Sequence, residues 1–130
     1  MLHLIKLAVG VRDIPHLRAL QAARAVADPP LRHRTRSTPR RRPEIVDAGG
    51  SIFWVVAGVV AARQRILDIR PDTWDDGRDC AALLLDPAVV PVRARAMKPF
   101  QGWRYLDAAA ASADFGAAEA ADAAGLPPAL

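Results

Sequence analysis

Apolar and polar residues alternate along several stretches of this 130-residue chain, and a spacing of two predicts β-strands. Near the N-terminus, for example, Lys6 separates Ile5 from Leu7. Elsewhere, runs of β-branched and aromatic residues favour strands as well. Strands are therefore predicted at residues 2–9, 52–57, 59–69, 80–85 and 89–95.

Turn residues separate these predicted strands. Gly58 follows the second strand, where it predicts a tight turn or a bulge. Asp76-Gly77 follows the third strand, and this pair is a strong hairpin signal. Residues 55–69 could instead form a helix, because residues 61–65 are good helix formers. The valines on both sides of Gly58 favour the strand, since β-branched residues and glycine weaken helices.

Two helices are predicted in the N-terminal half of the chain. Asp13 is expected to cap a helix over residues 14–27. A second, short helix is expected before Gly49-Gly50, which would supply a left-handed exit. This second helix begins either at Thr38 or at Pro43, because a proline suits the first turn in both cases.

These elements predict one α+β domain over residues 1–106, with a mixed or mainly antiparallel sheet of about five or six strands and two or three helices. A partly closed barrel is one form that such a sheet could take. Residues 107–130 are rich in alanine and carry four acidic residues and no basic one. An acidic C-terminal helix or tail is expected there.

The chain has a net charge of +4, and its basic residues are unevenly placed. Residues 31–42 hold six arginines and no acidic residue. The single cysteine, Cys80, excludes an intramolecular disulfide and favours a reducing cytoplasm. The longest apolar run, residues 52–62, is shorter than the roughly 20 residues of a membrane span. We therefore expect a soluble cytoplasmic protein with no membrane partner.

The arginine-rich segment is the first candidate for a binding site. Its guanidinium groups suit phosphate and carboxylate, and amides at the start of a nearby helix could point at the same anion. The alternative is a solvated basic loop whose arginines pair with acidic neighbours. The residues expected to supply charge to a ligand are Arg34, Arg36, Arg40 and Arg41.

A second candidate lies on the predicted strands. Arg63 and Arg65 fall on one side of their strand, and Arg93 and Arg95 repeat this spacing. If the two strands are neighbours, the four guanidiniums form one basic face in which Arg63 and Arg65 position a nucleic-acid backbone. The alternative is ordinary alternation, with arginines outward and apolar residues inward.

Residues 99–106 hold the densest aromatic patch of the chain. Aromatic side chains beside cations can stack unpaired bases, with Trp103 as the stacking residue. They can equally anchor a core, because each buries a large area. Gln101 and Arg104 are the other residues of this segment expected to face a ligand.

The sequence carries no recognisable catalytic signature. Ser51 and Cys80 are the candidate nucleophiles, but Gly49-Gly50-Ser51 differs from the Gly-x-Ser-x-Gly of a nucleophile elbow. Cys80 in an apolar strand is expected to behave as an inert small hydrophobe. The spacing of cysteine, histidine and aspartate fits neither zinc nor calcium. We predict no catalytic residue, no metal and no cofactor.

Three stretches together resemble a known family. They are residues 2–10 (Leu-His-Leu-Ile-Lys-Leu-Ala-Val-Gly), residues 47–68 (Asp-Ala-Gly-Gly-Ser-Ile-Phe-Trp-Val running into Ala-Arg-Gln-Arg-Ile-Leu-Asp) and residues 98–106 (Lys-Pro-Phe-Gln-Gly-Trp-Arg-Tyr-Leu). Over residues 1–107 the chain resembles the uncharacterised bacterial family catalogued as domain of unknown function 1489. Phe53 stands where a tyrosine is expected, and Ala57 stands where a lysine is common, which argues against a role for a hydroxyl or ammonium group there.

A weaker similarity concerns the order of the elements. It resembles that of PUA and ASCH-like folds, which are small, partly closed β-barrels flanked by helices and which often bind RNA. This likeness is an analogy between folds, and a fold alone does not carry a function.

The leading functional hypothesis is a small cytoplasmic binding module for RNA or another phosphorylated ligand, held by an arginine-rich face. The second hypothesis is a protein–protein adaptor that uses the same arginines on an acidic partner. The third is an enzyme acting on a phosphorylated small molecule, although the residues favour a protein without catalytic activity.

Overall fold

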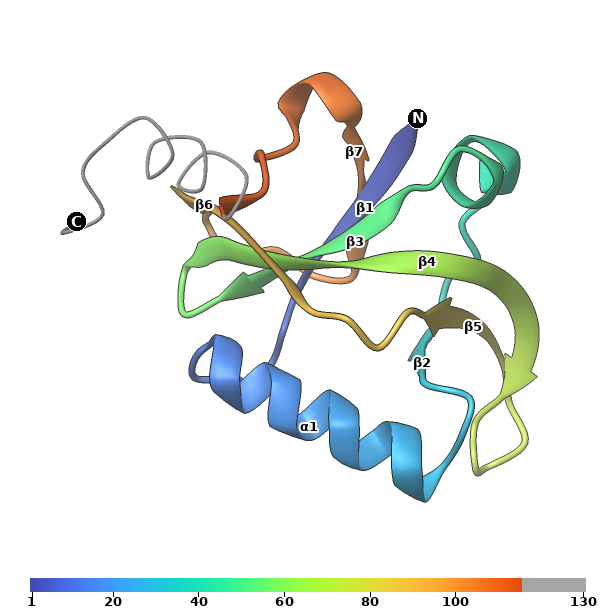
Figure 1. Cartoon of the computed structure of the whole chain (residues 1–130). Coiled ribbons are helices and arrows are strands. Elements are labelled where there is room, and N and C mark those ends of the chain that lie inside the picture. The colour runs from blue at the N-terminus through green and yellow to red at the C-terminus, as the bar shows by residue number, and fades with distance from the viewer. Residues whose placement is uncertain (116–130) are drawn as a thin grey trace, which may run out of the picture.

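Seven strands form one mixed sheet in the computed structural model, which describes residues 1–115 (Figure 1). A 14-residue α-helix lies against one face of this sheet, and two short helical turns, one π and one 3-10, complete the elements. In chain order the elements are β1 (Leu2–Leu7), α1 (Ile14–Ala27), β2 (Arg32–Thr35), η1 (Pro43–Asp47), β3 (Ser51–Val56), β4 (Val59–Thr73), β5 (Asp79–Leu85), β6 (Val90–Ala96), β7 (Trp103–Asp107) and η2 (Ala108–Ala110).

The strands follow the order β2-β5-β4-β3-β1-β7, and β6 pairs with β4 outside this path. Within residues 1–115, β1 and β3 run parallel and the other pairs are antiparallel. The predicted α+β class with a mixed sheet is therefore confirmed. The partly closed barrel is not, because β2 and β7 end the path without pairing with each other.

Strand β4 connects the two parts of the sheet. Its first half pairs with β3 and β6, and its second half pairs with β5. The pairing register shifts near Val60 and again near Ile66. Such irregularities bend a strand, and Figure 1 shows β4 as a curved ribbon that brings β5 and β2 towards the C-terminal half of α1.

The two predicted turns are confirmed. Ala57 and Gly58 have φ angles of 49° and 83°, which is the pattern of a two-residue hairpin loop. Gly77, at the turn between β4 and β5, has a φ of 85°. Residues 55–69 accordingly form strand and turn rather than the alternative helix.

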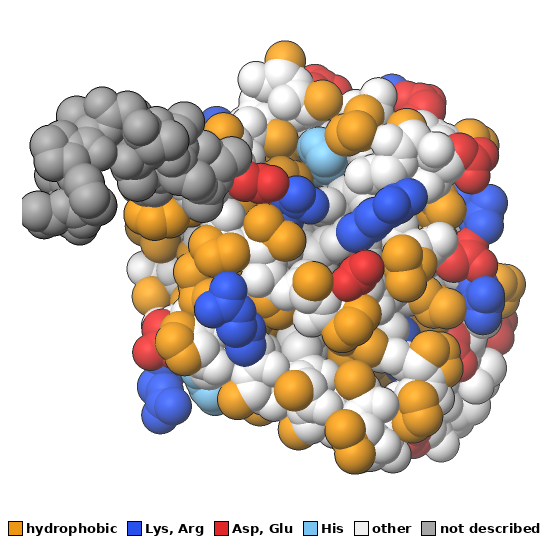
Figure 2. Space-filling view, viewed as in Figure 1, with side chains coloured by type: hydrophobic (Ala, Val, Ile, Leu, Met, Phe, Trp, Pro, Cys, Tyr) orange, Lys and Arg blue, Asp and Glu red, His pale blue; other side chains and the backbone are white. Residues whose placement is uncertain are grey.

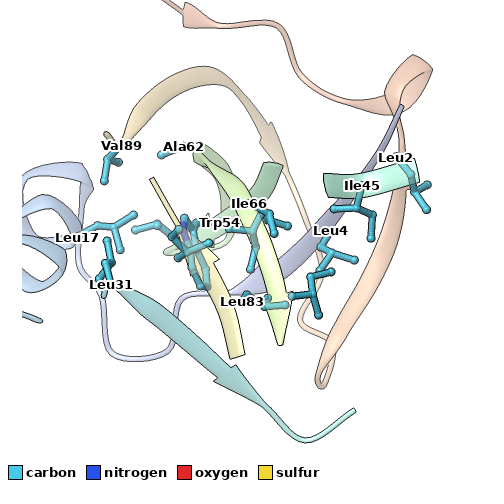
Figure 3. Close-up of a cluster of buried hydrophobic side chains, with 14 residues drawn as sticks. Leu2, Leu4, Leu17, Leu31, Ile45, Trp54, Ala62, Ile66, Leu83 and Val89 are labelled. Atoms are coloured by element: carbon cyan, nitrogen blue, oxygen red, sulfur yellow. The ribbon is translucent and has the colours of Figure 1, made fainter. Parts of the chain in front are cut away.

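Both faces of β3 are buried, and all six of its residues are inaccessible to solvent. On the face towards α1, Ile52 and Trp54 belong to a cluster that includes Leu17 of the helix (Figure 3). On the other face, Phe53 and Val55 belong to a second cluster. The apolar run in the sequence thus marks the centre of the molecule.

The caps of the helical elements follow the sequence. Asp13 accepts a hydrogen bond from the His16 amide at 2.8 Å, so the predicted cap of α1 is confirmed. Of the two predicted starts of the second helix, the structure has the one at Pro43. Gly49, with a φ of 82°, supplies the predicted left-handed exit.

Gly50, which lies between η1 and β3, has no side chain and so allows the chain to pass close to β1. A Cβ atom added at Gly50 would lie 2.2 Å from the carbonyl oxygen of Leu2 and 2.9 Å from that of Ile45. Both obstacles are backbone atoms, so a larger residue could enter only if a strand moved.

The expected acidic helix or tail lies mostly outside the described residues, which end at Phe115. The described part of this segment contains η2 and a single bridge between Asp114 and Val92. No helix within residues 1–115 is long and apolar enough to cross a membrane.

Candidate anion-binding site

A pocket of about 480 Å³ opens between α1, β1 and β2, and we call it the α1 pocket. This volume lies within the roughly 300–1,000 Å³ that is usual for small-molecule sites. Four basic side chains and one carboxylate line it, together with two indoles, an imidazole and an amide. These residues are Lys6, Arg24, Arg32, Arg34, Asp28, Trp54, Trp74, His33 and Gln21.

Lys6 and Arg24 supply the positive charge that no carboxylate neutralises. Lys6 stands opposite Trp54 in the pairing of β1 with β3, so its side chain lies on the sheet face that α1 covers. Arg24 comes from the last turn of α1 and donates a hydrogen bond to the Gln21 side chain at 3.1 Å. Neither residue forms an ion pair with any acidic residue among residues 1–115. Their charges are therefore available to an anion in the pocket.

Arg32 and Arg34, in contrast, are partly neutralised. Arg34 lies 2.9 Å from the carboxylate of Asp72, and Arg32 lies 3.0 Å from Asp28 and 3.4 Å from Asp72. The hydrogen bond from Arg34 lowers the pKa of Asp72, so this carboxylate stays charged. These pairs hold the two arginines at the mouth of the pocket and reduce the charge that they offer to a ligand.

A buried amide network shapes the inner wall of the pocket. Gln64, which is fully buried, accepts hydrogen bonds from the Gln21 side chain at 2.8 Å and from the Trp54 indole at 3.0 Å. Its own amide donates to the carbonyl oxygen of Asp86 at 3.0 Å. Because every member has a partner, this network fixes Trp54 and Gln21, and through Gln21 it also orients Arg24.

His33 lines the α1 pocket, and its pKa depends on its burial and on the charges nearby. Burial, and then the charges of Lys6 and Arg24, lower the pKa of His33 to about 4, so the ring is neutral at pH 7. The ring meets the Trp54 indole edge to face, with centroids 5.2 Å apart. Its Nε2 atom is buried and has no hydrogen-bond partner among the described residues. Burial would oppose a charge of either sign here, whereas the share of the shift that comes from Lys6 and Arg24 has the sign that attracts an anion.

The arginines of residues 31–42 differ in their surroundings. Of the predicted ligand-binding set, Arg34 alone lines the α1 pocket within the described chain. Arg41 pairs with Glu44, and Arg42 pairs with Asp68. Figure 2 shows the same mixing on the face that it displays, where several blue side chains lie next to red ones. For Arg34, Arg41 and Arg42 the structure agrees with the alternative of a basic segment paired with acidic neighbours.

The register does not confirm the predicted face of four strand arginines. Strands β4 and β6 do pair, but Arg63 stands opposite Val90 and Arg95 stands opposite Val60. Arg63 is also held by Asp114 at 2.7 Å, and that hydrogen bond raises the pKa of the guanidinium. Arg65 is exposed beside Gly49, away from the α1 pocket. Arg63 and Arg95 are therefore not direct cross-strand neighbours.

The aromatic segment divides between core and surface. Phe100 belongs to the second core cluster, and Arg104 lies over its ring at 4.6 Å from the centroid. Gln101 is exposed. Trp103 is partly buried, and its indole donates to the carbonyl oxygen of Ser37 at 2.9 Å. Neither Gln101 nor Arg104 lines the α1 pocket.

Within the described residues, neither candidate nucleophile hydrogen-bonds to a side chain that could accept its proton. Ser51 lies at a second hollow of about 390 Å³, where its hydroxyl accepts a hydrogen bond from Arg63 and its amide donates to His3. The imidazole therefore contacts the backbone rather than the hydroxyl. Cys80 is buried, and burial raises the pKa of its thiol.

Sequence reasoning missed the residues that give the α1 pocket its chemistry. Lys6, Gln21, Arg24 and His33 come from the first three elements, β1, α1 and β2, and only the packing of these elements brings their side chains to one pocket. One signal was available, because Gln21 follows Leu17 by four residues and so lies on the buried stripe of the helix. A polar residue in that position needs partners, but only the structure shows that they are Gln64 and Arg24.

Comparison with known proteins gives one match. A family model described as "Protein of unknown function (DUF1489)" matches residues 4–130. No curated protein matches the chain, and no solved structure matches it. The weaker likeness to PUA and ASCH-like folds therefore has no support from these comparisons.

Proposed function

The chain belongs to the DUF1489 family, whose description assigns no activity, and we propose from the geometry that it binds a phosphorylated ligand in the α1 pocket. One observation carries the proposal. Lys6 and Arg24 project into a pocket of ligand size, and no acidic residue among residues 1–115 pairs with either of them. Two unneutralised cations facing one cavity repel each other, and an anion between them removes that repulsion.

Phosphate suits this arrangement better than an apolar ligand does. A phosphoryl group accepts several charge-assisted hydrogen bonds at once, and Lys6, Arg24 and Arg34 approach the cavity from different elements. The remaining volume lies partly against Trp74, which is half-buried and offers aromatic surface to the rest of the ligand. The lone Cys80 suits a reducing compartment, and a cytoplasmic location is part of the proposal.

The test is isothermal titration calorimetry with uridine 5′-monophosphate and with inorganic phosphate at low salt. We expect binding whose logarithmic affinity falls as the logarithm of the salt concentration rises. Lys6→Met keeps most of the stem but removes the charge, and it should weaken binding roughly 10- to 150-fold, the effect of one charge-assisted hydrogen bond.

Arg12→Ala is the matched control, because Arg12 is exposed and does not line the pocket. This variant should bind like the unaltered protein. If neither probe gives a heat change, the pocket does not have this role. The same conclusion follows if Lys6→Met leaves the affinity unchanged.

A further inference from the structure

A loop of residues 36–42, which we call the basic loop, runs from the α1 pocket to the edge strand β7. It begins two residues after Arg34, which lines the pocket. Its backbone is fastened to β7 at two points. The Trp103 indole donates to the carbonyl oxygen of Ser37 at 2.9 Å, and the Tyr105 hydroxyl accepts from the Arg40 amide at 2.9 Å.

The pocket and this loop are contiguous through β1. Strand β7 pairs with β1, and Trp103 stands directly opposite Lys6. Side chains that face each other in an antiparallel pair lie on the same face of the sheet. Tyr105, two residues further along β7, is on that face as well. Lys6 therefore has the α1 pocket on one side and the Trp103–Tyr105 pair on the other.

The surface beyond Lys6 combines aromatic rings with available cations. Trp103 and Tyr105 meet at 69° with centroids 4.9 Å apart, and Tyr105 is 36% exposed. The guanidinium of Arg41 lies 5.5 Å from the Tyr105 ring centroid. The side chains of Arg36 and Arg40 form no ion pair with a residue in the described part of the chain.

We infer that the ligand of the α1 pocket is one nucleotide of a single-stranded nucleic acid, whose next residues cross Trp103 and Tyr105 while their phosphates contact Arg36 and Arg40. The inference rests on the proposed function, because the pocket holds the first nucleotide. It adds the chemical class of the partner. A free phosphorylated metabolite would not reach the loop, whereas a strand continues from the pocket with a charge and a base at each step.

Single-stranded nucleic acid fits this surface better than an acidic polypeptide does. Proteins that bind single strands place aromatic rings for the bases beside cations for the backbone, and both occur here next to a pocket. An acidic peptide would use the cations and leave the rings of Trp103 and Tyr105 unused. A double helix is disfavoured because its bases are not free to stack on a protein or to enter a pocket.

The experiment compares probes of increasing length by isothermal titration calorimetry at one salt concentration. The probes are uridine 5′-monophosphate, hexauridylate, hexathymidylate and hexa-aspartate. We expect at least one of the hexanucleotides to bind about tenfold or more tightly than the monophosphate, the gain that one stacked base contributes. The double variant Arg36→Ala/Arg40→Ala should remove most of that gain, and Arg12→Ala should keep it.

The outcomes separate the two proposals. If the monophosphate binds and neither hexanucleotide binds more tightly, the extended surface is refuted and the pocket remains. If hexa-aspartate gains as much as the hexanucleotides, the partner is an acidic chain and the inference is wrong. If the hexanucleotide gain survives Arg36→Ala/Arg40→Ala, the basic loop is not the contact. Failure of every probe to bind removes the proposed function itself.

Discussion

Acidification should destabilise this protein through His33, which is enclosed by Trp54 and by the cations Lys6 and Arg24. The pKa of His33 is about 4 in the folded protein, against 6.5 for an unperturbed histidine. Between these two values the unfolded chain binds a proton at His33 and the folded chain does not. The free energy of unfolding must therefore fall as the pH falls through this window.

The magnitude follows from the two pKa values. At pH 7 His33 is mostly neutral in both states, so its contribution to the pH dependence is small. At pH 5 the unfolded state is protonated and the folded state is not, which removes about 2 kcal/mol of stability. At pH values below the folded pKa the loss levels off at about 3 kcal/mol.

The assay is urea denaturation of the protein and of the His33→Gln variant at pH 7 and pH 5. Glutamine is polar and neutral at both pH values, so this variant has no proton to bind at residue 33. The comparison between variants matters because burial also lowers the pKa of His3, which contributes a loss of the same sign to both proteins. Asp68, whose pKa is about 2, titrates below the window.

The expected result is that the unaltered protein loses about 2 kcal/mol more than His33→Gln between pH 7 and pH 5. The absolute stability of the variant does not enter this difference. An equal loss in both proteins would mean that His33 takes up its proton without resistance, and the lowered pKa assigned to its burial and to its cationic neighbours would be wrong.

Two further changes test the fold. Gly50→Ala should destabilise the protein by roughly 1–3 kcal/mol in urea denaturation, because the added Cβ meets the Leu2 backbone. The loss should be larger than that of Gly49→Ala, where only the positive φ opposes alanine. An equal loss of stability in both variants would contradict the close approach at Gly50. Gln64→Leu should cost roughly 2–4 kcal/mol, because it leaves buried donors without an acceptor, whereas Gln101→Leu on the surface should cost little. A Gln64→Leu variant as stable as the Gln101→Leu control would show that the network is not needed.

Local chemistry made most of the elements predictable. The cap at Asp13, the turn at Gly58 and the exit at Gly49 each depend on one or two residues, and the structure has all three. Strand β3 was recognisable because a strand buried on both faces must be apolar throughout. The start of η1 was ambiguous in the sequence, because Pro39 and Pro43 both suit the first turn of a helix.

The site was less predictable, because charge in the sequence does not measure charge available to a ligand. The arginines of residues 31–42 form the most conspicuous basic segment, yet Arg34 and Arg42 are paired with Asp72 and Asp68, more than 25 residues away. Lys6 was not predicted to bind a ligand, because it is an isolated basic residue in an apolar strand. It matters because β1 lies beside β3 and α1 covers that face.

Contacts between residues close in the chain were enough to predict five of the seven described strands, the turns and the first helix, but not β2 or β7. The sequence also made a basic surface that binds an anionic partner a reasonable hypothesis. The choice of which cations face a cavity and which face a carboxylate is made only when the chain folds. That decision depends on the pairing of β1 with β3 and β7 and on the curvature of β4, which bring together residues from opposite ends of the chain.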